Sequence, residues 1–252
     1  MDNLSSPIPI DSPRAAHFLA CHTLPLALKK SATDKPHQVE IRATFSLIEI
    51  GKRHFFVTSA HVLERFEEMQ VHHPSAQIAA YTTVPKFTEL FGFHLMDSER
   101  KILDVAIFRG LEARIELSER FFIPYEGSYL ADPVIGELVC IVGYPSDCVE
   151  VVDGRADLNY TQLIFPVSSI SDRHVVLADE NGQRQFRDFL RPDQTNINLG
   201  GLSGSAAYVF RNSRFRFIGI VNECHEQDQT ILISRLGCLT SNGTIDRSRM
   251  PY

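Results

Sequence analysis

The chain lacks the features of a disulfide scaffold, a membrane span or a secreted precursor. Its five cysteines are an odd number and include no Cys-x-x-Cys pair, which favours a reduced, cytoplasmic protein. No window approaches the roughly 18 uninterrupted apolar residues of a membrane-spanning helix. The opening residues, MDNLSSPIPIDSPRAAHF, have no basic n-region and no sustained apolar core, so we expect no secretory signal.

Basic runs and metal-ligand patterns are also scarce. The formal net charge is −6, and no long run of Lys or Arg appears, so nucleic acid is not an expected partner. Two Cys-His dipeptides, Cys21-His22 and Cys224-His225, have no second ligand pair at zinc-like spacing. The sequence therefore predicts no metal site and no cofactor.

What the chain does contain is apolar material in short strand-like segments. Hydrophobic residues make up 44% of the sequence, enough for one or two cores. Helical periodicity is limited to residues 61–70 and an ambiguous stretch at 111–122. Many short strands with few helices favour an all-β barrel or sandwich fold. The expected strands are 39–50, 53–59, 76–84, 101–110, 136–145, 160–170, 174–178, 205–210, 214–221 and 229–234.

Glycine and proline cluster near residues 125–137, between two strand-rich halves of similar length. This composition predicts a boundary there. We expect an N-terminal arm at 1–15, a first domain at 16–130 and a second domain at 131–252.

The segment NLGGLSGSAAYVF, residues 198–210, places a serine among glycines directly before an expected strand. A nucleophilic serine in acyl transfer needs a base for its proton and backbone N–H groups directed at the developing oxyanion. Glycines let the backbone fold tightly enough to present such groups, and Gly201 and Ser203 are the expected donors. The alternative is a glycine-rich hairpin with an incidental serine.

Two further polar residues stand out, one at the exit of an apolar strand and one within another. His61 follows the strand in FFVTSAH, where it is either a general base or a histidine that caps the next helix. Asp104 is the single carboxylate in ILDVAIF, and a buried carboxylate needs a hydrogen-bond partner, such as a histidine Nδ1–H. A solvent-facing aspartate is the alternative, and Asp97 in the polar MDSER loop is a rival acid.

Together, TSAH at 58–61, DVA at 104–106 and GLSGS at 201–205 resemble the chymotrypsin-like (trypsin-like) serine peptidases, specifically their compact bacterial and viral members. The resemblance covers roughly residues 39–234. It implies two six-stranded antiparallel β-barrels with few short helices. It also implies a triad of His61 and Asp104 on the first barrel and Ser203 on the second, with the amides of Gly201 and Ser203 as the oxyanion hole.

The chain order His, Asp, Ser separates this arrangement from other serine hydrolases. An α/β-hydrolase requires Gly-x-Ser-x-Gly, whereas position 205 is serine. It also needs an acid and then a histidine after the nucleophile. The single histidine after Ser203 is His225, and the only acid between the two is Glu223, two residues before it. A subtilisin-type order needs an aspartate before His61 and a helix-rich α/β pattern that is absent.

The chain departs from the secreted digestive members of that family in two ways. Leu202 precedes the serine where those enzymes have an aspartate that pairs with a new N-terminus, which excludes activation by that ion pair. The framework of disulfides is missing too. The oxyanion loop must therefore be held by packing or by an activating protein partner.

The resemblance also implies a specificity pocket. Ile197 lies near its base, and the segment IVNECH forms one wall through Val221, Asn222 and Glu223. Ile197 favours a small or apolar substrate side chain, whereas Glu223 favours a basic one.

The resulting prediction is a serine endopeptidase that cleaves protein or peptide substrates through an acyl-enzyme, without a cofactor. An esterase that uses the same residues is a variant of this prediction. The alternative is a catalytically silent or partner-activated peptide-binding module on the same fold.

Overall fold

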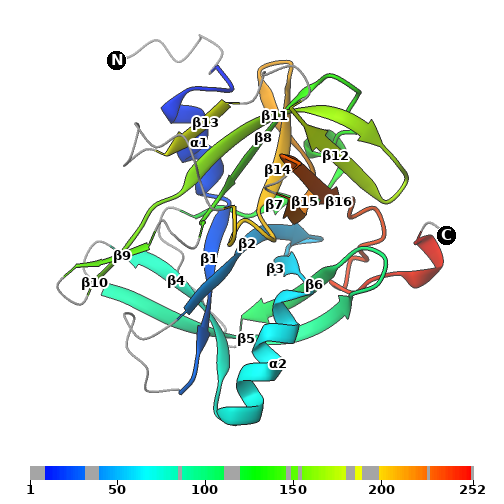
Figure 1. The fold of residues 1–252 in the computed structure, drawn as a ribbon. Helices are drawn as coiled ribbons and strands as arrows, with labels where there is room; N and C mark the ends of the chain where they lie inside the picture. The colour runs from blue at the N-terminus through cyan, green and yellow to red at the C-terminus, as the bar shows by residue number, and fades with distance from the viewer. Residues whose placement is uncertain are drawn as a thin grey trace.

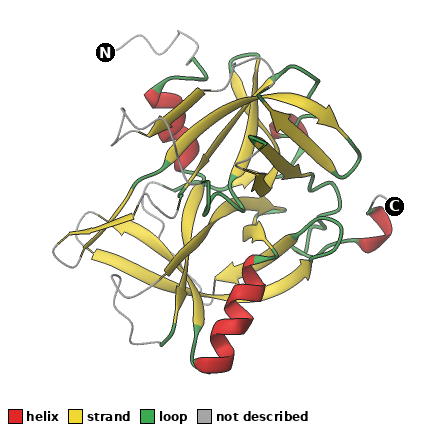
Figure 2. Ribbon diagram, in the orientation of Figure 1, coloured by secondary structure: helices red, strands yellow, loops and turns green. Residues whose placement is uncertain are grey.

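Two β-sheets dominate the molecule, as Figures 1 and 2 show. Each sheet has seven strands among the described residues. The architecture comes from a computed structural model that describes residues 9–31, 40–84, 87–110, 120–145, 149–152, 155–179, 185–188, 199–225 and 228–250. The described α-helices are α1 (Pro13–Ala20) and α2 (Val62–His72). Helix α2 overlaps the helix predicted at 61–70; it begins one residue later and ends two residues beyond the predicted end.

Six strands of the first sheet close into a ring in the order β1-β2-β3-β6-β5-β4, with every neighbouring pair antiparallel. The short strand β7 adds to β2 in parallel. Gly51 and Lys52, both at positive φ, form the predicted turn between β2 and β3. The strands are β1 (Thr23–Lys29), β2 (Glu40–Ile50), β3 (Arg53–Ser59), β4 (Gln77–Val84), β5 (Phe87–Glu99), β6 (Val105–Gly110) and β7 (Ile123–Pro124).

The second sheet repeats this strand order as β8-β11-β12-β16-β15-β14. Its ring closes through β11, which pairs with β8 along its first part and with β12 near its end. Because β12 joins β11 over only three residue pairs, this sheet is a more open, curled barrel than the first. The strands are β8 (Leu138–Gly143), β11 (Thr161–Ile170), β12 (His174–Ala178), β13 (Gln185–Asp188), β14 (Ala206–Arg211), β15 (Arg214–His225) and β16 (Thr230–Ser234); β9 (Val149–Val152) and β10 (Arg155–Leu158) form a separate hairpin.

The predicted all-β fold with two antiparallel barrels and few short helices is thus confirmed. Strands of the first sheet lie within residues 23–124, and strands of the second sheet lie within 138–234.

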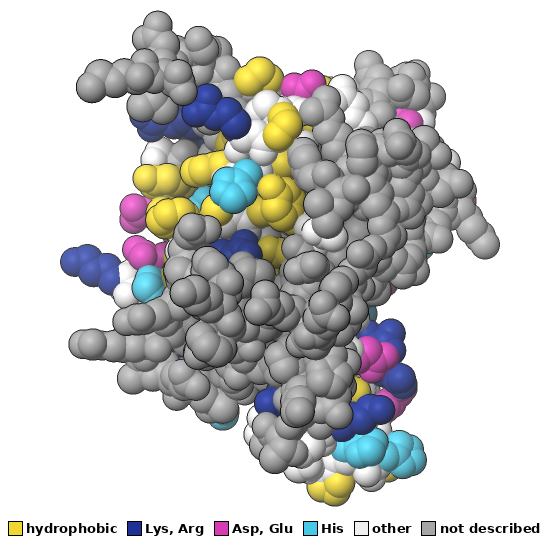
Figure 3. Space-filling view, turned by 90° about the vertical axis from the view of Figure 1, so that its left-hand side faces the viewer, with side chains coloured by type: hydrophobic (Ala, Val, Ile, Leu, Met, Phe, Trp, Pro, Cys, Tyr) yellow, Lys and Arg dark blue, Asp and Glu magenta, His cyan; other side chains and the backbone are white. Residues whose placement is uncertain are grey.

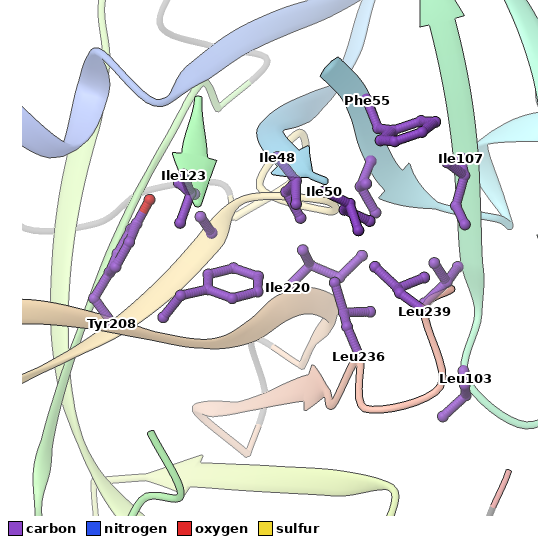
Figure 4. Close-up of a cluster of buried hydrophobic side chains, with 14 of the residues drawn as sticks. Ile48, Ile50, Phe55, Leu103, Ile107, Ile123, Tyr208, Ile220, Leu236 and Leu239 are labelled. Atoms are coloured by element: carbon purple, nitrogen blue, oxygen red, sulfur yellow. The ribbon is translucent and has the colours of Figure 1, made fainter. Parts of the chain in front are cut away.

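Central strands are buried on both faces, which explains their continuous apolar runs. In β8, Val139 and Ile141 fill the second barrel, whereas Cys140 and Val142 pack between the barrels. The interior of the first barrel is a separate cluster that includes Phe45. The cluster between the barrels, drawn in Figure 4, joins side chains of both sheets such as Ile48, Ile107, Tyr208 and Ile220.

The two ends of the described chain pack across this arrangement. Helix α1 begins at Ser12, whose Oγ accepts a hydrogen bond from the Ala15 N–H, and Pro13 occupies its first turn. Its Leu19 joins the cluster between the barrels. Residues 13–15, expected as part of an extended arm, are therefore helical, and the Ser-Pro signal of a helix start was overlooked.

After β16 the chain returns to the first barrel. The Ile245 N–H and the Arg247 guanidinium both donate to Asp97 of β5, at 2.9 Å and 2.8 Å. Gly243, at φ +73°, lies so close to Phe55 that a Cβ there would stand 1.9 Å from the ring. Close approach and backbone conformation both require glycine at this position.

The surface around α1 carries exposed aromatic side chains. Phe18 is 46% exposed and Phe121 is 59% exposed, and both rings lie against His22. Figure 3, which views the side of the molecule that bears α1, shows hydrophobic side chains open to solvent beside a histidine. None of the helices in the described ranges has the length and apolar character needed to cross a bilayer.

Candidate active site

Two hydrogen bonds join His61 and Asp104 at one end of the first barrel. His61 lies between β3 and α2, and Asp104 is the residue before β6. The Asp104 carboxylate accepts from the His61 backbone N–H at Oδ1 and contacts the ring Nδ1 at Oδ2, both at 2.6 Å. The His61 side chain makes no capping bond to α2. Its ring is therefore fixed by the carboxylate, as expected for a general base, and not by the helix.

The surroundings favour the protonated form of His61. Burial lowers the pKa of its imidazole, but the hydrogen bond that the ring donates to Asp104 and the negative charges of Asp104, Glu223 and Glu64 outweigh burial and raise the pKa above its usual value. The His61 side chain is 42% exposed, whereas the Asp104 side chain is 13% exposed. The pair thus has a sheltered acid and a ring that remains open to solvent.

The position of Asp104 differs in one detail from the sequence prediction. Strand β6 begins at Val105, not at residue 101, and Asp104 lies in the preceding loop with φ +50°. Aspartate tolerates this left-handed conformation better than most residues. The rival acid, Asp97, binds Arg247 and the Ile245 N–H, and does not contact His61.

Ser203 lies in a loop of two consecutive turns before β14. The Leu202 N–H donates to the Leu199 carbonyl, and the Ser205 N–H donates to the Leu202 carbonyl. Gly201 and Gly204 have φ of +95° and +85°. A Cβ on Gly204 would stand 2.1 Å from the Thr44 carbonyl oxygen, so only glycine fits there.

Strand β2 of the first barrel binds three carbonyls of the loop at residues 199–205, which we call the nucleophile loop after the role predicted for Ser203. The Thr44 N–H donates to the Ser203 carbonyl at 2.9 Å, and Thr44 Oγ1 donates to the Gly201 carbonyl at 3.0 Å. Ser46 Oγ donates to the Gly204 carbonyl at 2.6 Å. The Tyr144 N–H in turn donates to Thr44 Oγ1 at 3.0 Å. The loop that lacks an aspartate beside the serine is held by hydroxyls of the opposite barrel.

The same loop adjoins the segment that carries His61. The Val221 carbonyl of β15 accepts from both the Gly204 N–H, at 2.7 Å, and Ser59 Oγ, at 2.8 Å. Ser203 is next to Gly204, and His61 is two residues after Ser59. The shared Val221 carbonyl therefore brings the two segments together. Among the described residues, no hydrogen bond joins the Ser203 hydroxyl to the His61 ring.

The two amides predicted for the oxyanion hole are left open. Neither the Gly201 N–H nor the Ser203 N–H has an acceptor in the described part of the chain. The Leu202 carbonyl, which shares a peptide plane with the Ser203 N–H, accepts from Ser205. Since the two groups of a trans peptide point in opposite directions, the Ser203 N–H faces away from that turn.

The predicted specificity residues have different surroundings. Val221 is fully buried, and its side chain packs in the interior of the second barrel. Asn222 sits at a bulge in the β15–β16 pairing and is 5% exposed, with no partner for its Oδ1 among the described residues. Glu223 is exposed and lies 3.1 Å from His225. Ile197 falls outside the described residues.

Sequence inspection missed the binding of the loop by Thr44 and Ser46. Both residues are fully buried in β2. Their signal is a pair of hydroxyl residues two apart within ATFSL, which places both on one face of the strand.

No cluster of His, Cys, Asp or Glu in the described ranges is suited to hold a metal ion. The chain matches no protein-family model, and no curated protein is significantly similar to it.

Proposed function

We propose that this protein is a serine endopeptidase in which Ser203 is the nucleophile, His61 the general base and Asp104 the residue that orients the base. The observation that carries the proposal is the two-bond anchoring of His61 by Asp104, next to a serine loop with two open amides. The chain resembles the chymotrypsin-like serine peptidases in its motifs, and the matching strand order of the two barrels supports this assignment.

The proposed reaction has two stages, acylation of Ser203 and hydrolysis of the acyl-enzyme, and the same residues act in both. Ser203 Oγ attacks the carbonyl carbon of the scissile peptide bond, and its proton passes to His61 Nε2. The Gly201 and Ser203 amides stabilise the oxyanion of the tetrahedral intermediate. His61 then gives the proton to the leaving amine, which leaves an acyl-enzyme, and water repeats the sequence to release the acid. Asp104 stays ionised and stabilises the imidazolium.

A second candidate is a silent or partner-activated peptide-binding module. The absence of a hydrogen bond between the Ser203 hydroxyl and the His61 ring in the described structure favours it. Such bonds are often long in unliganded enzymes and shorten when substrate binds. The two candidates therefore differ in whether the isolated chain reacts.

A fluorophosphonate probe tests this directly, because it labels only an activated serine. We expect the wild-type chain to be labelled and Ser203→Ala to lose all labelling while it keeps its circular dichroism spectrum. Ser75→Ala, a serine on the surface beyond α2, serves as the matched control and is labelled normally.

A peptide library read by mass spectrometry then reports cleavage positions, and a parallel ester substrate separates peptidase from esterase activity. If the folded wild-type chain is neither labelled nor cleaves any peptide, catalysis by the isolated chain is wrong and the binding module is favoured.

A further inference from the structure

The loop that carries Asp104 is held by one carboxylate. Strands β5 and β6 end their pairing at Glu99 and Val105, which leaves residues 100–104 as the hairpin loop. The Glu99 carboxylate accepts the backbone N–H of Lys101 at Oε1, at 3.0 Å. Its Oε2 accepts the N–H groups of Ile102 and Leu103, at 2.8 Å and 2.7 Å.

These three bonds satisfy three consecutive N–H groups of the loop, and other elements satisfy two of its carbonyls. Ser234 Oγ of β16 donates to the Leu103 carbonyl, and the Ala60 N–H donates to the Asp104 carbonyl at 3.0 Å. Burial raises the pKa of the Glu99 carboxyl, but the three backbone bonds and the charge of Arg247 outweigh burial and lower it below its usual value. Glu99 is therefore ionised at neutral pH, which strengthens all three bonds.

The loop needs this support because Asp104 has an unfavourable backbone conformation. A non-glycine residue at φ +50° lies in the left-handed region, which is less favourable than the right-handed helical or extended regions, and a loop without its acceptor can relax to another turn. Any such relaxation rotates the Asp104 carboxylate, which holds both the backbone and the ring of His61.

We propose that Glu99 is a positioning residue, whose carboxylate fixes the loop 100–104 so that Asp104 can orient His61. The expected loss of reactivity rests on the proposed function. The expected effect on the position of Asp104 and on the titration of His61 does not. Glu99 itself touches neither Ser203 nor His61 in the described structure.

The test follows His61 by NMR in Glu99→Ala, with His61→Gln used to assign its resonances. We expect the pKa of His61 to fall, because a displaced Asp104 no longer supplies its hydrogen bond and charge. The downfield Nδ1 proton signal should also be lost. Fluorophosphonate labelling should slow by about tenfold or more, since loss of the triad acid itself costs about 10⁴-fold.

Asp97→Asn is the matched control, because it removes a carboxylate from the same hairpin that binds the C-terminal segment instead of the loop. It should leave the titration of His61 unchanged. A double variant, Glu99→Ala with Asp104→Asn, should label no more slowly than Asp104→Asn alone, because Glu99 acts through Asp104.

A wild-type His61 titration and an intact downfield proton in Glu99→Ala overturn the proposal, even if the variant melts at a lower temperature. If the alanine variant does not fold, Glu99→Gln replaces it, since the amide keeps one acceptor oxygen. This variant must also lower the pKa of His61. An unchanged titration of His61 in Glu99→Gln overturns the proposal equally. Absence of labelling in the wild type defeats the proposed function, but the titration still decides the role of Glu99.

Discussion

The two barrels share one strand order and differ in what they bring to the candidate site. The first barrel supplies His61 and Asp104 from two neighbouring strand connections, joined by direct hydrogen bonds. The second supplies Ser203 on a loop whose carbonyls are bound by β2 of the first barrel. The acid–base pair is thus internal to one barrel, whereas the nucleophile loop depends on contacts with the other.

This difference predicts two kinds of variant. Changes within the first barrel that displace Asp104 should alter both the titration of His61 and reactivity. Changes at the contact between β2 and the nucleophile loop should alter reactivity alone. Three predictions separate these effects.

The largest effect is expected from Asp104→Asn. The amide cannot stabilise the imidazolium and favours the wrong tautomer of His61, so fluorophosphonate labelling should slow by about 10⁴-fold. The pKa of His61 should fall as well, because its main raising influence is removed. Labelling within a few-fold of the wild-type rate would show that Asp104 is not the triad acid.

A smaller effect is expected from Thr44→Val. The substitution removes the donor to the Gly201 carbonyl and the acceptor for the Tyr144 N–H. Labelling should slow by roughly ten- to a hundredfold, since the loop loses support beside the oxyanion amides. The titration of His61 should not change.

Thr23→Val is the matched control for this comparison. Thr23 is a buried threonine of the same barrel whose Oγ1 donates to the Ala20 carbonyl, away from the site. Each variant should lose about 1–3 kcal/mol of unfolding free energy because a buried group is left unpaired. Equal losses of labelling in both variants would mean that general stability, and not the contact with the loop, sets the reactivity.

The smallest effect is expected from Glu223→Gln. Only neutral His61 can accept the serine proton, so reactivity falls below the pKa of His61, which lies above its usual value of 6.5. Loss of the Glu223 charge lowers that pKa, and the acid limb of the pH–rate profile should move to lower pH. Glu68→Gln, an exposed glutamate of α2 that pairs with Arg65, should leave the limb in place. An unmoved limb in Glu223→Gln would contradict the assigned charge effect.

The barrels also differ in how far their strands follow from local sequence. All six ring strands of the second barrel overlap predicted segments, because each contains an apolar run bounded by turn residues; β15 continues four residues beyond its predicted end at 221. In the first barrel, β1 and β5 were missed. Strand β1 contains Pro25, which normally weakens a strand prediction. It is tolerated because β4 pairs only with residues 26–29, and because Thr44, opposite Pro25 in β2, donates its N–H to Ser203 instead of to β1.

For the candidate site, residue types and order along the chain singled out His61, Asp104 and Ser203. His61 ends an apolar strand, Asp104 is the lone carboxylate in an apolar run, and Ser203 lies among glycines before a strand. The supporting groups could not be found in this way. Thr44 and Glu99 resemble ordinary strand residues, and their roles depend on partners brought close by folding.

The sequence by itself determined most of the ring strands, the turn at Gly51-Lys52 and the candidate reactive groups, because apolar runs and turn chemistry are local properties. Tertiary structure decided how the nucleophile loop is held and how the acid meets the histidine. Thr44 Oγ1 and the Gly201 carbonyl are 157 residues apart in the chain, and His61 and Asp104 are 43 apart. Contacts over such separations arise only when the barrels close and pack, so no short stretch of sequence encodes them.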